Sequence, residues 1–93
     1  MATESNVKKI VEQKLSAISN RPMSVVENPE NSLRGALLLS EGMIRVSAVS
    51  ISRAIKAEYP DKALPITQSS MLICKKIKQV TALALKRANG DPA

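Results

Sequence analysis

The sequence predicts an all-α fold, in which a short first helix packs on a long antiparallel hairpin of two further helices. Three segments carry apolar residues at helical spacing, over about residues 5–19, 29–58 and 66–89. Prolines separate these segments, accompanied by asparagines in the first connection, as is typical of connections between helices. The 93 residues suit one domain, and residues 90–93 are expected to form a flexible tail.

The segment over 5–19 has a regular amphipathic pattern. Val7, Val11 and Leu15 recur every four residues, while charged and amide side chains occupy most positions between them. Ser5 suits the N-cap because its hydroxyl can accept a hydrogen bond from a backbone N–H of the first turn. The amphipathic pattern stops at residue 20, because residues 20–29 contain two prolines and two asparagines. The conformation of residues 20–28 is left open, either an extended segment or a strand.

A helix start signal precedes the segment over 29–58. Asn28 can cap the helix, and Pro29 suits the first helical position because it has no N–H to donate. Glu30 then places a negative charge at the positive end of the helix dipole. These features predict one long helix from residue 29 to residue 58.

The long helix is expected to carry a broad apolar stripe. A strand over "MIRVSAVSIS" is the alternative, but its alternation fails where Ala48 and Val49 adjoin, whereas the helical register continues. Small side chains on this helix would allow close approach of a second copy, and a larger apolar surface is easily made by pairing two chains. The side chains expected to form the core or the seam of a homodimer are Leu37, Ile44, Ala48, Ile51 and Ile55.

The third expected helix, over 66–89, follows the short connection "EYPDKALP". A short connection predicts that the second and third helices are antiparallel neighbours. Ile73, Cys74 and Ile77 begin its apolar face, and most of its charged side chains lie on the other face. Asn89 and Gly90 suit the left-handed residue that often ends a helix.

The positive charge of the chain is concentrated near its C-terminus. The net charge is +6, and no Asp or Glu occurs between Lys62 and Gly90. A neutral surface would normally intersperse glutamate with lysine, so this asymmetry favours a polyanionic partner.

Three cations are expected to form a line along the second helix. Arg34, Arg45 and Lys56 are spaced by eleven residues, which is close to three helical turns. Arg53 lies beside them, whereas Glu41 can pair with Arg45 and cancel part of the charge. The third helix adds a second basic strip, consisting of Lys75, Lys76, Lys78, Lys86 and Arg87. The alternative for both surfaces is a solvated helical face.

The residue types indicate which polyanion to expect. Proteins that bind single strands stack bases on aromatic rings, and Tyr59 is the one aromatic residue here. A duplex contacted through its phosphates fits better, whether DNA or RNA, and on architecture alone the expected fold resembles small helical dimers that bind double-stranded RNA. The leading hypothesis is therefore a homodimeric nucleic-acid-binding protein. The alternative is a protein-interaction or assembly module that uses the wide apolar face of the second helix.

The sequence gives little support to catalysis or to a cofactor. It has no histidine and one cysteine, so the commonest general base and the cysteine-rich zinc sites are absent. No glycine-rich loop precedes a helix, which argues against nucleotide binding. We therefore expect a non-enzymatic protein with no cofactor and no metal.

Compartment is inferred from what the sequence lacks. No apolar run approaches the roughly 20 residues of a membrane span, and the N-terminus has no apolar core of a signal peptide. Membrane-surface binding would favour Trp or Phe anchors, which do not occur. The expectation is an intracellular protein, cytoplasmic or nuclear, that does not engage a membrane.

Overall fold

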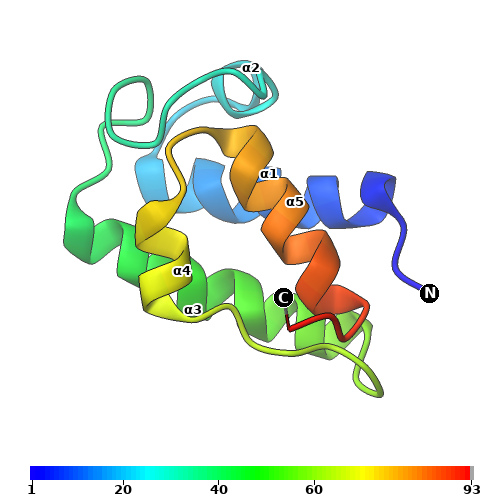
Figure 1. Cartoon of the computed structure of the whole chain (residues 1–93). Helices are drawn as coiled ribbons and strands as arrows, with labels where there is room; N and C mark the ends of the chain where they lie inside the picture. The colour runs from blue at the N-terminus through cyan, green and yellow to red at the C-terminus, as the bar shows by residue number, and fades with distance from the viewer. Residues whose placement is uncertain (93) are drawn as a thin grey trace.

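The all-α prediction is confirmed by the structure, a computed structural model that describes residues 1–92. Within these residues it contains five helices and no β-strand (Figure 1). The helices are α1 (Glu4–Ser19), α2 (Met23–Val26), α3 (Glu41–Glu58), α4 (Gln68–Ile73) and α5 (Ile77–Ala88). Helix α1 packs against α3 and α5, and α4 packs against α3. The molecule measures 34 × 24 × 18 Å along its principal axes.

Helix α1 covers almost the range that its pattern predicts. Its N-cap is Thr3, whose hydroxyl accepts a hydrogen bond from the backbone N–H of Asn6, so the expectation of Ser5 was wrong. Val7, Val11 and Leu15 are fully buried, as apolar residues spaced by four on one helical face should be. The segment left open at 20–28 contains the single helical turn α2.

The prediction of a helix from residue 29 was wrong, because α3 begins at Glu41. The predicted capping residue Asn28 begins a single turn instead of a helix, and its side-chain oxygen accepts a hydrogen bond from the N–H of Glu30. Farther on, Leu38 has a left-handed backbone with φ 54°, which no α-helix contains. Ser40 then caps α3 by accepting a hydrogen bond from the N–H of Met43 at 3.2 Å.

Residues 29–33 instead bond to the start of α5. The carbonyls of Pro29 and Asn31 accept hydrogen bonds from the N–H groups of Lys78 and Ile77, both at 3.0 Å. These donors belong to the first turn of α5 and have no partner within that helix. Pairing them with residues 29–33 satisfies them, and this tertiary interaction outweighs the local helix signal.

The helix predicted over 66–89 is interrupted between α4 and α5. The structure therefore has three helices, α3, α4 and α5, where the sequence predicted a second and a third. Helix α4 ends at Ile73, and the backbone is extended at Cys74 and at Lys76. Lys76 forms an isolated antiparallel bridge with Ser32. The side-chain oxygen of Gln79 accepts from the N–H groups of Lys75 and Lys76, at 2.6 and 3.1 Å, which stabilises the break.

The core lies on one side of α3, between α1, α4 and α5. The five residues expected at the core or at a dimer seam are each at most 1% exposed within the single chain: Leu37, Ile44, Ala48, Ile51 and Ile55. One chain therefore covers this stripe by itself. Burial of such side chains is worth roughly 1.5–3 kcal/mol each relative to exposure.

The start of the chain contacts the end of α5. The side-chain oxygen of Asn89 accepts a hydrogen bond from the N–H of Ala2 at 2.9 Å. Gly90 has φ 79°, a left-handed conformation that favours glycine, as its pattern predicted. Of the expected tail over 90–93, Gly90 and Asp91 donate hydrogen bonds back to α5, and residue 93 lies outside the described residues.

Candidate functional site

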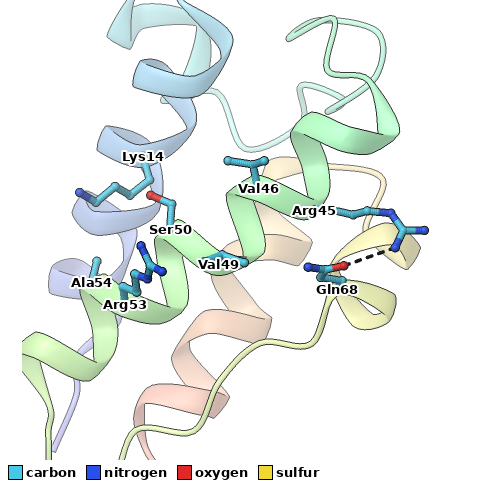
Figure 2. A pocket seen from close by; sticks show the side chains of 8 residues that line it. All are labelled: Lys14, Arg45, Val46, Val49, Ser50, Arg53, Ala54 and Gln68. Carbon is cyan, nitrogen blue, oxygen red and sulfur yellow. Dashed lines mark hydrogen bonds between the residues drawn. The ribbon is translucent and has the colours of Figure 1, made fainter.

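An open groove runs along the outer side of α3, where α3 faces α1 and α4. Its volume is about 550 Å³. Figure 2 shows Lys14 on α1 at one side of α3, and Gln68 at the start of α4 on the other side. We call this the α3 groove, and the residues that line it are Lys14, Arg45, Val46, Val49, Ser50, Arg53, Ala54 and Gln68.

The periodicity of α3 places these side chains opposite the core. Val46, Val49 and Arg53 recur every three or four residues, so they share one face of the helix. Ile44 and Ile51 lie on the other face and are fully buried. Val46 is 58% exposed and Val49 is 39% exposed, so the middle of the groove is an apolar surface in contact with solvent.

The groove is cationic. Lys14, Arg45 and Arg53 line it, and none of its lining residues is acidic. Lys14 and Arg53 have no ion pair or hydrogen bond from their side chains to any residue within 1–92. Both charges are therefore available to an anion.

Arg45 is held at one end of the groove. Its guanidinium donates a hydrogen bond to Glu41 at 2.8 Å and another to the side-chain oxygen of Gln68 at 3.3 Å (Figure 2). The hydrogen bond and the charge of Arg45 lower the pKa of Glu41. Because the pair is exposed, it contributes little to stability, but it orients the guanidinium.

The predicted line of three cations along one helix was wrong. Arg34 precedes α3, and its guanidinium donates to the carbonyl of Leu72 at 3.2 Å, so it is not on the helix that carries Arg45. Arg45 and Lys56 remain in line on α3, roughly 16.5 Å apart along the axis. The ammonium of Lys56 donates to the carbonyl of Pro60 at 2.8 Å, at the C-terminal end of the helix.

The second basic strip is divided into groups with different surroundings. Lys76 and Lys78 both pair with Glu30, at 2.9 and 2.8 Å. Hydrogen bonds from Lys78 and then Lys76 lower the pKa of Glu30 to about 2. Arg87 is 8% exposed, and its guanidinium donates to the carbonyl of Asp91. Three of the five cations of the strip are thus paired with an acid or buried.

Lys75 and Lys86 are the exposed members of the strip whose side chains have no such contact within residues 1–92. No residue of the strip lines the α3 groove. In Figure 2, α5 passes behind α3 and away from the groove. The structure therefore does not bring the strip together with the cations of α3.

Three polar residues of the groove were missed by reasoning from the sequence. Lys14 belongs to a charge-neutral N-terminal segment, and Gln68 lies at the start of a helix that has no charged residue. Ser50 is one of several serines along α3. No local signal distinguishes any of them, because their proximity results from the packing of α1 and α4 against α3.

The one cysteine shows no sign of a reactive site. Cys74 is buried, and its thiol lies 3.6 Å from the carbonyl of Ser70, to which it donates. Burial raises the pKa of the thiol, which opposes formation of the nucleophilic thiolate. Among residues 1–92, no group of three histidine, cysteine, aspartate or glutamate side chains is arranged to hold a metal ion.

Comparisons with other proteins identify no relative: no protein-family model, no curated protein and no solved structure matches the chain. Within the described residues, none of the helices has both the length and the apolar character needed to cross a membrane.

Proposed function

We propose that this protein is a non-catalytic nucleic-acid-binding protein that holds the phosphate backbone of a duplex in the α3 groove. The observation that carries the proposal is the groove lining, in which three cations occur together with no acid. Phosphate oxygens are contacted by arginine and lysine, and also by serine and amide side chains. The groove offers all of these types, since Ser50 and Gln68 accompany the cations.

The state of the cations supports this proposal. Lys14 and Arg53 form no ion pair within residues 1–92, so a phosphate would not have to displace an acidic side chain in order to bind them. Arg45 remains paired with Glu41 and would contact a phosphate at the end of the groove. Displacement of condensed counterions by such cations is the main source of affinity for a phosphate backbone.

The absence of suitable aromatic residues favours a duplex over a single strand. Tyr59, the one aromatic residue, is half-buried, and its hydroxyl is enclosed without a hydrogen-bond partner in the described structure. It does not line the groove. Bases of a single strand would therefore find no ring on which to stack there.

Fluorescence anisotropy tests the proposal. Labelled double-stranded RNA, double-stranded DNA and single-stranded RNA of equal length are titrated with the protein at two salt concentrations. We expect both duplexes to bind better than the single strand, with an affinity that falls steeply as salt rises. Absence of binding at low salt would contradict the proposal.

A protein partner is the second candidate. The surface that this hypothesis first used, the wide apolar face of α3, is covered by the chain itself. Exposed Val46 and Val49 favour a different surface, in which an amphipathic acidic helix places its apolar side chains on these valines. Replacing both valines with serine would weaken such a partner and leave phosphate-driven duplex binding nearly unchanged.

We also propose that the chain acts as a homodimer, which would double the number of phosphate contacts. Since the expected seam is buried within one chain, a dimer would use other side chains, such as Leu38 and Ile73, which are 64% and 77% exposed. Sedimentation equilibrium at several concentrations tests this. A single species with the mass of one chain would contradict dimerisation without affecting the groove proposal.

A further inference from the structure

A second cleft, on the opposite side of α1 from the α3 groove, has a different chemical character. It lies between α1, the α2 region and α5, and its volume is about 280 Å³. Aliphatic walls come from Val26, Pro29, Ile77 and Leu85. Three carboxylates also line it, those of Glu4, Glu12 and Glu27, so we call it the acidic cleft.

Glu12 is the distinctive residue of the acidic cleft. It is 7% exposed, although carboxylates are almost never buried without a partner. Its nearest cation is the ammonium of Lys8 at 3.9 Å, beyond hydrogen-bonding distance. Within residues 1–92 its carboxylate accepts no hydrogen bond, and Glu12 is one of the residues that line the cleft.

The electrostatics of the cleft agree with this geometry. Desolvation raises the pKa of Glu12, Lys8 partly opposes the rise, and the charge of Glu27 adds to it. The effect of Glu27 means that the two carboxylates are close enough to repel each other. A cation between them would relieve both the desolvation of Glu12 and the repulsion.

The two lysines that line the cleft supply that cation only in part. Lys78 donates to Glu30 at 2.8 Å, so its ammonium is already bound to a carboxylate outside the cleft lining. The side chain of Lys8 is 47% exposed and reaches Glu12 only at the longer distance. The cleft therefore keeps an excess of negative charge beside an aliphatic wall.

We propose that the acidic cleft binds a small aliphatic ammonium ligand. The ammonium group lies between Glu12 and Glu27 and donates hydrogen bonds to the buried carboxylate of Glu12. The alkyl chain packs on Val26, Ile77 and Leu85. A volume of about 280 Å³ is at the small end for ligand pockets, which suits a short alkyl chain rather than a larger ring system.

NMR titration with hexylammonium chloride tests this proposal, with hexanol as a ligand of the same length but without charge. We expect saturable shifts of the methyl resonances of Val26, Ile77 and Leu85 with hexylammonium, and weaker binding of hexanol. Because a hydrogen bond to a charged group is lost, Glu12→Gln should weaken hexylammonium binding by at least about tenfold. Equal binding of the two ligands, or no methyl shifts, would overturn the proposal.

Glu58→Gln is the matched control, because it removes one acid at the end of α3, outside the acidic cleft. Hexylammonium affinity should not change in this variant, and an equal loss in both variants would indicate nonspecific attraction to surface acids. Far-UV circular dichroism checks that Glu12→Gln folds. If it does not, Glu27→Gln, at an exposed position, provides the same comparison.

Discussion

The α3 groove has three cations and the basic strip at the start of and along α5 has five, but the surroundings of the two sets differ. The strip lies in the part of the sequence with the highest positive charge, yet Lys76 and Lys78 share Glu30 and Arg87 is buried. The groove draws Lys14 and Arg53 from segments of near-neutral charge and leaves both without an acidic partner. Charge density along a sequence therefore does not measure the charge that a surface presents.

The largest expected effect comes from reversing two charges in the α3 groove, compared with the same change in the basic strip. Lys14→Glu with Arg53→Glu removes two proposed phosphate contacts and adds repulsion, so duplex affinity should fall by about a hundredfold at low salt. The matched control, Lys75→Glu with Lys86→Glu, changes the net charge equally and should cost less than about threefold. Fluorescence anisotropy measures both, and equal losses would show that the groove has no special role.

The position of α4 beside the groove depends on Ser52. The hydroxyl of Ser52 accepts a hydrogen bond from the N–H of buried Ile66 at 2.9 Å, two residues before Gln68. Ser52→Ala leaves that N–H without a partner and should lower the free energy of unfolding by about 1–3 kcal/mol. Urea denaturation measures the change. Ser69→Ala, at an exposed position on α4, is the control, and a similar loss there would contradict this role for Ser52.

Neutralising Glu30 should leave two cations of the strip without an acidic partner, as Lys14 and Arg53 are in the groove. Glu30→Gln removes the acid shared by Lys76 and Lys78, so both ammonium groups become available to phosphate. Duplex affinity is expected to rise about twofold at low salt, a small gain because the strip lies outside the α3 groove, with a slightly steeper dependence on salt. Unchanged affinity would mean that the strip lies outside the surface that contacts the duplex.

The lowered pKa of Glu30 makes the ion pairs of the strip dependent on pH. Folding lowers this pKa from 4.5 to about 2, so the ion pairs stabilise the fold above the ordinary value and are lost as pH falls through about 2. Carboxyl resonances followed by NMR should show Glu30 ionised at pH 3.5. In the variant with both Lys76→Gln and Lys78→Gln, the pKa should return toward its ordinary value, and no change would show that the pairs are not formed in solution.

The smallest effect concerns Glu12, whose pKa shifts in the other direction. A carboxyl whose pKa is raised by folding opposes folding when ionised, and this penalty disappears as pH falls below its ordinary value. Glu12→Gln should therefore raise the free energy of unfolding at pH 7, by less than about 1 kcal/mol. The difference from wild type should vanish near pH 3. A destabilised variant at pH 7 would contradict the desolvation argument.

By itself, the sequence determined the helical class, the buried stripe of α3 from Ile44 to Ile55, and the extent of α1. These features follow from the period of apolar residues, which is local and needs no knowledge of neighbouring elements. Arg45 and Arg53 were also assigned to the candidate surface from the sequence. The groove that joins them to Lys14 and Gln68 was not, because those residues come from other elements.

Only the tertiary structure decided where the second and third predicted helices end. A capping signal at Asn28 and a helical pattern across Cys74 are both real, but hydrogen bonds between residues 29–33 and the start of α5 compete with them. The same contact brings Glu30 to Lys76 and Lys78 and so neutralises the part of the sequence that looked most basic. Local propensities are worth less than about 1 kcal/mol per residue, so a few long-range hydrogen bonds and the packing that accompanies them can reverse them.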